Sequence, residues 1–379
     1  MKTAAIICEY NPFHSGHKFH IDETKRKTGA DAIIAVMSGN FVQRGDVAVF
    51  KKETRAKIAL LNGADLVLEL PARYSSASAE IFARSAASII NSLGIVDYLS
   101  FGAECEDLTS LSALADFFVS ESPEFSEALK KHSANGLSFP AARAKSAEDL
   151  LGKDAKNLLS TPNNLLGIEY LKALSSLGSN IIPVVIPRTG AQHDSTLTTE
   201  TTASATYIRS LISSGSLESA KPYIPTSAFE MLKEERVHSL KNIEKAILCC
   251  LINTPAERLR QIADVTEGLE NRIKAAAASS NSLEELLDKV KTKRYTHSRL
   301  RRIMLASLLG ITDEQRQSPV SYIKILDHNE KGRKLIAAAK KTAVLPIVRN
   351  TSQVNKLEGS DIKSMWEQER TFDSIYNLC

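Results

Sequence analysis

The fold of this chain is decided by nine residues near its N-terminus, Glu9-Tyr10-Asn11-Pro12-Phe13-His14-Ser15-Gly16-His17. They follow the apolar run Ala4–Cys8, which is typical of a buried parallel strand, and precede the polar segment Lys18–Lys27, which can form a helix. Such a junction is a natural phosphate site, because helix N-terminal amides point outward and a glycine lets phosphate approach the backbone closely. Two imidazoles there can donate hydrogen bonds to phosphate oxygens as charge shifts during attack at phosphorus. We therefore expect His14 and His17 to be catalytic, although an inert surface turn is the alternative that the spacing alone leaves open.

Length and composition limit the class of protein. The 379 residues are too many for one ordinary single-core domain, so two domains are expected. The apolar fraction of 43% is that of a soluble globular protein, and neither a membrane span nor a signal peptide is recognisable. None of the five cysteines belongs to a Cys-x-x-Cys pair, which argues against a structural zinc site and for a cytoplasmic location. Because the net charge is only +4, any nucleic-acid partner must be met by a local basic patch.

Apolar runs and helical segments alternate along the first half of the chain. The runs expected to be strands are Ala4–Cys8, Ala32–Met37, Leu66–Leu70, Tyr98–Phe101 and Ile181–Ile186. The segments expected to be helices between them are Ile21–Lys27, Lys51–Asn62, Ala79–Leu93 and Leu165–Leu177. This alternation predicts an α/β fold with a doubly wound parallel sheet over residues 1–215, interrupted by a helical insertion at about residues 108–159. The strand signals then fade, which predicts a mainly α-helical C-terminal domain over residues 216–379, to which Tyr322–Asp327 and Ala343–Val348 add short strands or irregular structure.

Further polar groups follow the predicted strands at their carboxyl ends, where ligands bind in such sheets. Beyond the long polar loop after the second strand, Lys51, Lys52 and Arg55 open a helix, either to hold anionic ligands or as a solvated helix face. Gly102, after the fourth strand, either leaves room for a base or ribose or is a plain turn glycine. Arg188, after the fifth strand, is suited to bidentate contact with phosphate.

A second candidate phosphate site is Ser204-Ala205-Thr206-Tyr207-Ile208-Arg209. Ser204 can cap a helix whose free amides face a phosphate, although an ordinary N-cap explains the segment equally well in isolation. Together with His14-Ser15-Gly16-His17, this segment resembles the two signatures of the nucleotidylyltransferase superfamily. Members of that superfamily catalyse the attack of a substrate on the α-phosphate of ATP or CTP, and pyrophosphate is released.

Five motifs in order resemble the bacterial tRNA(Met) cytidine acetate ligase family. They are Glu-Tyr-Asn-Pro-Phe-His-Ser-Gly-His (9–17), Met-Ser-Gly-Asn-Phe-Val-Gln-Arg-Gly (37–45), Asn-Gly-Ala-Asp-Leu-Val-Leu-Glu-Leu-Pro (62–71), Ser-Phe-Gly-Ala-Glu (100–104) and Pro-Asn-Asn-Leu-Leu-Gly-Ile-Glu-Tyr (162–170). The resemblance implies a Rossmann-like sheet of the nucleotidylyltransferase type. It also implies a ligase that makes acetyl-adenylate from acetate and ATP and transfers the acetyl group to N4 of the wobble cytidine of elongator tRNA(Met). Acetyl-CoA is not used, and Mg²⁺ is expected to bridge the phosphates, although no ligand cluster for it stands out in the sequence.

The same resemblance implies which residues bind ATP. His14 and His17 lie at the phosphates, Arg188 matches a late nucleotide-binding arginine, and Asn164 is preferred over Asn163 as a further contact. The full set of expected ATP-binding residues is Ile7, Cys8, Glu9, Tyr10, Asn11, Pro12, Phe13, His14, Ser15, Gly16, His17, Lys18, Phe19, His20, Gly102, Asn163, Asn164, Arg188 and Ser204.

A basic cluster in the second half of the chain indicates a function for the C-terminal domain. Lys and Arg contacts to phosphate dominate the affinity of proteins for nucleic acids, and a tyrosine can stack on an unpaired anticodon base. The expected tRNA-binding residues are Lys291, Lys293, Arg294, Tyr295, Arg299, Arg301 and Arg302. A solvated basic helix face is the alternative reading of this cluster.

Two other functions remain open at this stage. A small-molecule adenylyl- or cytidylyltransferase of cofactor metabolism explains the first domain but leaves the basic helical domain idle. A non-catalytic RNA-binding protein with a degenerate nucleotide fold is opposed by the intact His14, Gly16 and His17. The sequence does not name a general base for the acyl transfer.

Overall fold

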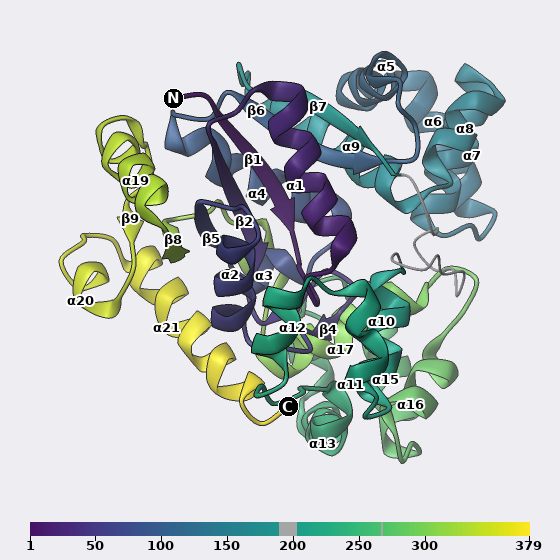
Figure 1. The fold of residues 1–379 in the computed structure, drawn as a ribbon. Coiled ribbons are helices and arrows are strands. Elements are labelled where there is room, and N and C mark those ends of the chain that lie inside the picture. The colour runs from purple at the N-terminus through teal and green to yellow at the C-terminus, as the bar shows by residue number, and fades with distance from the viewer. Residues whose placement is uncertain (189–202, 267) are drawn as a thin grey trace.

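A mostly parallel seven-stranded sheet forms the centre of the computed structural model, which describes residues 1–188, 203–266 and 268–379 (Figure 1). The strand order is β7-β6-β1-β2-β5-β8-β9, and among the paired neighbours only β5 and β8 run antiparallel. The strands are β1 (Thr3–Cys8), β2 (Ala32–Ser38), β5 (Leu66–Leu70), β6 (Tyr98–Ala103), β7 (Ile182–Pro187), β8 (Ile323–His328) and β9 (Ile347–Val348). The predicted α/β fold is confirmed.

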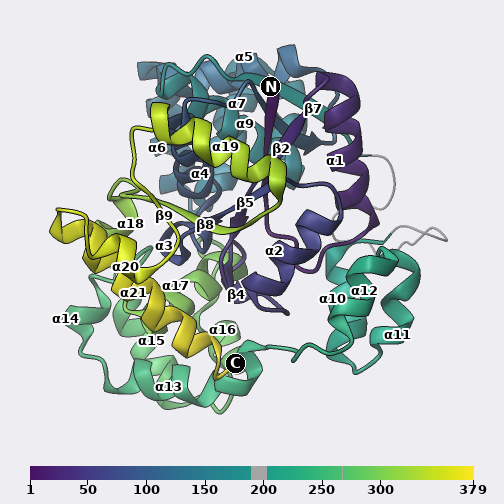
Figure 2. The ribbon, with the colours of Figure 1, turned by 60° about the vertical axis from the view of Figure 1, so that its left-hand side comes forward.

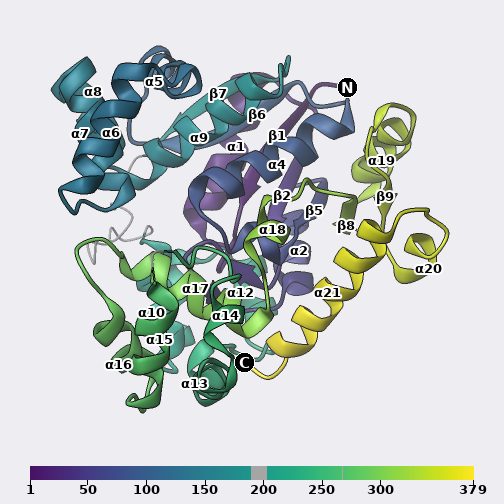
Figure 3. The same cartoon turned by 180° about the vertical axis from the view of Figure 1, so that it is seen from behind.

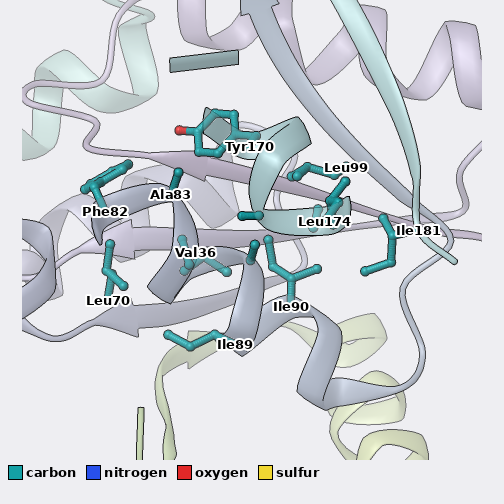
Figure 4. Close-up of a cluster of buried hydrophobic side chains, with 14 of the residues drawn as sticks. Val36, Leu70, Phe82, Ala83, Ile89, Ile90, Leu99, Tyr170, Leu174 and Ile181 are labelled. Carbon is teal, nitrogen blue, oxygen red and sulfur yellow. The ribbon is translucent and has the colours of Figure 1, made fainter. Parts of the chain in front are cut away.

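Helices cover both faces of the sheet because its buried strands present apolar side chains on both sides. Ile6, Ile33 and Ala35 point into a core with the helices of one face, whereas Ala5 and Val36 point into a core on the other face. One face carries α1 (Ser15–Thr28) and α2 (Lys52–Leu61), and the other carries α3 (Ala72–Ser75), α4 (Ala79–Leu93) and α9 (Pro162–Ser176). Figure 4 shows the second of these cores, where side chains of α4 and α9 meet those of the sheet.

The insertion between β6 and α9 is helical, as the sequence predicts. It consists of α5 (Leu108–Ser120), α6 (Pro123–Ala134), α7 (Phe139–Leu151) and α8 (Lys153–Leu159). These four helices form a group at one end of the molecule in Figures 1 and 3.

The polar loop after β2 folds into a hairpin that the sequence pattern did not reveal. It contains β3 (Phe41–Val42) and β4 (Asp46–Val47), which pair antiparallel. Phe41 and Val47 are buried in the core of the helices that follow, so the hairpin joins the two halves of the chain.

Most of the second half is helical. The first helices after β7 are α10 (Ala205–Ser213), α11 (Leu217–Ala220), η1 (Lys221–Tyr223) and α12 (Thr226–Leu232), which project beside α2 in Figure 2. A separate helical core follows in η2 (Leu240–Ile243), α13 (Glu244–Asn253), α14 (Ala256–Leu259), α15 (Leu269–Ala278), α16 (Leu283–Val290), α17 (His297–Leu309) and α18 (Asp313–Gln317).

The last part of the chain returns to the sheet. Strands β8 and β9 extend the sheet beyond β5, and they are accompanied by α19 (Glu330–Thr342), α20 (Thr351–Val354) and α21 (Ser360–Tyr376). Helix α21 runs from the edge of the sheet to the helical core, which it reaches with Phe372 and Tyr376 (Figure 3). The sheet is therefore built from residues on both sides of the predicted boundary at residue 215.

A buried ionic network fastens α21 to the sheet. Lys52 Nζ lies 2.7 Å from Glu69 Oε1 and 2.6 Å from Asp373 Oδ2, and its side chain is only 2% exposed. Lys324 Nζ lies 2.6 Å from the other oxygen of Glu69. Because both lysines face Glu69, they hold the pKa of that carboxyl below its usual range in spite of its burial.

Glu369 is the third carboxylate of this region and has no lysine of its own. Both of its oxygens accept from the backbone amide of Ala72, at 2.9 and 3.0 Å. Burial, together with the nearby charge of Glu69, raises the pKa of Glu369 to about 7. The folded protein therefore retains a proton on Glu369 at pH values where the unfolded chain has lost it.

We predict that stability decreases as pH rises through this window. The folded-state pKa is about 7 and the ordinary value about 4.5, so unfolding releases a proton between these two values. Glu369→Gln keeps an oxygen that can accept from Ala72 N but removes the titration. The free energy of unfolding of this variant, measured relative to that of the wild type, should increase from pH 4.5 to pH 7 by on the order of 3 kcal/mol. Above pH 7 this difference should stay constant. Urea unfolding across this pH range measures the difference, and a pH-independent difference would refute the assignment.

Glu330→Gln is the matched control for this measurement. Glu330 pairs with Arg333 on the surface of α19, and both side chains are more than 70% exposed. The stability difference between this variant and the wild type should show no comparable dependence on pH.

Candidate active site

The candidate site lies at the carboxyl ends of β1 and β6. From β1 the chain continues to β2 and β5 on one side, whereas β6 and β7 lie on the other side. The strand order thus reverses between β1 and β6, and such a switch point leaves a crevice for a ligand. Helix α1 begins at this place, with His14 as its N-cap residue.

His14 and His17 cap the helix reciprocally. Nδ1 of His14 accepts from the backbone N–H of Gly16 at 3.1 Å, and Nδ1 of His17 accepts from the backbone N–H of His14 at 3.2 Å. A ring nitrogen that accepts a hydrogen bond carries no proton, so each neutral imidazole has its proton on Nε2. The two ring centroids are 3.8 Å apart. The first turn of α1 therefore provides two adjacent Nε2–H donors of fixed tautomer.

Two histidines of α1, His17 and His20, are neutral at physiological pH. Burial lowers the pKa of His17 well below its usual value, and His14, Arg188 and Arg209 add to the effect. Burial and Arg188 lower the pKa of His20 to about 4. Positive charge near these rings is therefore supplied by Arg188 and Arg209.

A sharp turn of the backbone directs these rings to the site. Tyr10 has a φ of 47°, in the left-handed region that non-glycine residues rarely adopt. Its buried ring packs against Phe13 and His17, with centroids 4.8 and 4.9 Å away. Packing around Tyr10 therefore stabilises the turn that places His17.

Gly102 and Arg188 form the opposite side of the crevice. A Cβ atom at Gly102 would lie 3.4 Å from Cγ of Arg188, an ordinary contact distance, so the glycine lies directly beside the arginine side chain. Arg188 Nη1 lies 3.4 Å from Oδ1 of Asn163, and Nδ2 of Asn163 donates to Glu104. The arginine, the amide and the carboxylate thus lie in one row at this edge.

The two asparagines have different tasks. Asn164 is 4% exposed, and its Oδ1 accepts from the amides of Glu104 and Cys105, both at 2.9 Å. Asn164 therefore holds the loop after β6, whereas the half-buried Asn163 lies beside Arg188. The sequence comparison preferred Asn164 as a contact for ATP, whereas the geometry favours Asn163.

The second predicted signature meets the first. Ser204 Oγ accepts from the backbone N–H of Tyr207 at 3.1 Å and caps α10. Nη1 of Arg209 donates to the carbonyl oxygen of Asn11 at 3.0 Å. Arg209, which was not among the predicted site residues, therefore lies at the candidate site.

The remaining residues of the first motif divide into supporting and surface positions. Glu9 Oε1 accepts from Gln43 N at 2.9 Å, and Asn11 Oδ1 accepts from Val49 N at 2.8 Å, so both carboxylate and amide hold the hairpin loop. Ile7, Cys8, Pro12 and Phe13 are buried or half-buried in and after β1, whereas Ser15 donates to the carbonyl of Tyr223. Lys18 pairs with Asp22, and Phe19 is 45% exposed on α1.

Two of the cations at the start of α2 are structural. Lys52 belongs to the buried network, and Arg55 is 0% exposed with its N–H groups on the carbonyl oxygens of Phe50, Glu9, Ser38 and Gly39. Neither can hold a ligand, and neither lies on a solvated face. Lys51 is exposed, and its Nζ lies 3.3 Å from Oε1 of Glu235.

The basic cluster is partly a surface. Lys291, Lys293, Arg294 and Arg301 are exposed before and on α17. Arg299 and Arg302 are half-buried: Nη2 of Arg299 donates to the carbonyl of Asp264 at 2.9 Å, and Nε of Arg302 lies 3.6 Å from its carboxylate.

Tyr295 does not offer its ring for stacking on a base. The residue is 8% exposed and belongs to the helical core, with the Arg299 guanidinium 5.2 Å from its ring centroid. The expected stacking role of Tyr295 is therefore wrong, because its aromatic surface is used for packing.

Within residues 1–188, 203–266 and 268–379, no group of three or more His, Cys, Asp or Glu side chains could hold a metal ion. Over the same residues, no helix is long and apolar enough to cross a membrane.

Comparison with known proteins assigns the family. The family model described as HIGH Nucleotidyl Transferase matches residues 1–379. The tRNA(Met) cytidine acetate ligases of Acetivibrio thermocellus and of Thermoanaerobacter sp. are 39% and 40% identical, over 100% of this chain and 95% of their own lengths.

Solved structures agree. The apo crystal structure of Thermotoga maritima TmcAL has a TM-score of 0.94 at 32% identity, over 99% of this chain and 94% of that one. The same protein bound with alpha-thio ATP gives a TM-score of 0.90 at 32% identity, over 98% and 92% of the two chains. This chain therefore belongs to the HIGH nucleotidyl transferase family and, within it, to the tRNA(Met) cytidine acetate ligases.

Proposed function

We propose that this protein activates acetate with ATP as acetyl-adenylate and transfers the acetyl group to N4 of the wobble cytidine of elongator tRNA(Met). The observation that carries the proposal is the reciprocal cap of His14 and His17, which places two Nε2–H donors at a helix N-terminus. It is supported by the full-length similarity to enzymes named for this reaction and to a structure that holds an ATP analogue.

In the first step an acetate oxygen attacks the α-phosphorus of ATP and pyrophosphate leaves. Charge builds up on the phosphates, so the protein acts by positioning and by neutralisation. The Nε2–H groups of His14 and His17 donate to phosphate oxygens, and Arg188 and Arg209 supply positive charge. Mg²⁺ would neutralise the triphosphate further, held by phosphate oxygens and water.

We assign residues 1–215 to adenylation and the helical core of residues 240–317 to binding tRNA. The exposed cations of the basic cluster lie on that core, and Gly45 of the hairpin packs directly on the backbone of α17. The end of the cluster at Arg301 and Arg302 therefore lies beside the hairpin that is bound to the first motif. A small-molecule nucleotidylyltransferase has no use for this arrangement.

A cytoplasmic location follows from the substrate. The tRNA and ATP of a bacterium are found in its cytoplasm, and all five cysteines of the chain are free thiols, as a reducing compartment maintains.

We predict that free acetate is the acetyl donor. A site for nucleotidyl transfer has no task if the acyl group arrives already activated as a thioester. Two parallel reactions test this, one with acetate and ATP and the other with acetyl-CoA without ATP, each with tRNA(Met). Acetylcytidine should form only in the first, and formation only in the second would refute the proposal.

We predict that His14→Asn and His17→Ala each lower acetate-dependent ATP–pyrophosphate exchange by about 10²–10³-fold, the typical cost of losing a preorganised donor. Asparagine is a good N-cap, so His14→Asn removes the Nε2–H donor and keeps the cap of α1. His132→Asn is the matched control, because that histidine lies on the insertion beside Asp149. Exchange at the wild-type rate in both site variants would exclude these roles.

We predict that the triple variant Lys291→Ala, Lys293→Ala and Arg294→Ala binds tRNA more weakly and forms acetyl-adenylate normally. Each lost phosphate contact should reduce the slope of log affinity against log salt by about 0.7–0.9. The control triple, Lys334→Ala, Lys340→Ala and Lys341→Ala, changes exposed lysines of α19, at the amino edge of the sheet. If the first triple leaves affinity and slope unchanged, the tRNA docks elsewhere.

A further inference from the structure

The hairpin of β3 and β4 connects the nucleotide site to the basic cluster. On one side, Gln43 N donates to Glu9 and Val49 N donates to Asn11, so the turn of the hairpin and the residues after β4 are fixed to the first motif. On the other side, Gly45 has a φ of +72°, and a Cβ there would lie 2.4 Å from the backbone nitrogen of Arg302. The hairpin is therefore wedged between the loop after β1 and helix α17.

Asp46 stands at this junction. Its Oδ2 lies 3.3 Å from Nη1 of Arg301, and its Oδ1 accepts from Val47 N at 2.8 Å. Arg209, which also contacts Asn11, is the second cation that acts on it. The carboxylate is 41% exposed, so it remains accessible to a substrate. Asp46 thus lies between a cation of the nucleotide site and a cation of the basic cluster.

Other groups near the crevice are less suited to accept a proton. Both oxygens of Glu104 are used by Asn163 and Asn164, and these hydrogen bonds hold the pKa of Glu104 below its usual range in spite of burial. The Nδ1 atoms of His14 and His17 are occupied as acceptors.

We propose that Asp46 is the general base of the acyl transfer, an inference that rests on the proposed function. The exocyclic N4 of the cytidine attacks the carbonyl carbon of acetyl-adenylate, forming the N–C bond. The bond from that carbon to the phosphate oxygen breaks, and AMP leaves with the electron pair. One proton of N4 passes to Oδ2 of Asp46, which later returns it to water. Arg301 orients the carboxylate and ties it to the helix that carries the tRNA.

The electrostatics of the hairpin agree with this role. Partial burial raises the pKa of Asp46, whereas the amide of Val47 and the charges of Arg301 and Arg209 lower it. The thiol of Cys379 is the further titratable group near it. A carboxylate with a raised pKa is a stronger base near neutral pH than an ordinary one.

The test separates the two half-reactions. Asp46→Asn, Asp46→Glu and the wild type are compared in acetate-dependent ATP–pyrophosphate exchange, and then in single-turnover transfer of acetyl to tRNA(Met) from enzyme-bound acetyl-adenylate. Transfer is followed as a function of pH, and tRNA affinity is measured in parallel. Asp288→Asn, which removes an exposed carboxylate from the neighbouring α16, is the control for the change in charge.

For Asp46→Asn we expect unchanged exchange, unchanged or tighter tRNA binding, and transfer slower by about 10²-fold or more. Wild-type transfer should fall as pH decreases through the pKa of the base, and this fall should vanish in Asp46→Asn and persist in Asp46→Glu. Transfer at the wild-type rate in Asp46→Asn, or slow transfer with the wild-type pH profile, overturns the inference. Equal loss of exchange and transfer also overturns it. If the wild type itself shows no acetate-dependent exchange, the proposed function fails instead.

Discussion

The buried guanidinium of Arg55 is the interaction on which the site depends. It is 0% exposed, and it donates from Nε to the carbonyl of Phe50 at 2.9 Å and from Nη1 to those of Glu9 and Ser38 at 2.6 and 3.1 Å. One side chain thereby satisfies carbonyl groups that follow β1 and β2 at the edge where the strands end. Loops at such an edge have few backbone partners of their own, and a buried carbonyl without a partner is costly. Arg55 thus fixes the start of the turn that leads to His14.

The first turn of α1 combines structural and chemical roles in the same atoms. An N-terminal turn leaves backbone amides without partners, and here the Nδ1 atoms of His14 and His17 accept from two amides near this helix start. These bonds fix the orientation of both rings and direct the remaining proton of each ring to Nε2. Because burial also keeps His17 uncharged, the site presents oriented N–H dipoles, and its positive charge comes from the arginines. The hydrogen bonds that cap the helix therefore also orient the donors of the proposed phosphate site.

The two halves of the chain are joined by buried polar and apolar contacts. Lys52 binds both Glu69 in β5 and Asp373 in α21, and Asn40 donates to the same Asp373. Phe41 of the hairpin is buried in the helical core with Phe372. Such contacts give the proposed adenylation site and the proposed tRNA-binding core a fixed relative position, which a reaction in two steps on one bound intermediate requires.

The sequence by itself determined five parallel strands of the sheet and the two signatures. Five apolar runs separated by helical segments predict the parallel strands, because a strand buried on both faces must be apolar throughout, and α4 spans Ala79–Leu93 as predicted. His14 and His17 could be selected because their spacing and their position after a strand are local properties. The hairpin at residues 41–47 escaped prediction because its two strands are only two residues long.

Only the tertiary structure decided the roles of the remaining polar residues. The sequence pattern indicates surface cations in a helix at Lys52 and Arg55, yet both are buried. Lys52 pairs with Asp373, which is far away in sequence, and Arg55 binds backbone carbonyls of other loops. Tyr295 reads as an aromatic in a basic patch, yet it packs into the helical core. Asn163 and Asn164 are neighbours of the same type, and only the position of the loop after β6 separates a ligand-facing amide from a structural one. Burial and ion pairing arise from contacts distant in sequence, so a local pattern can name such residues but cannot assign their environment.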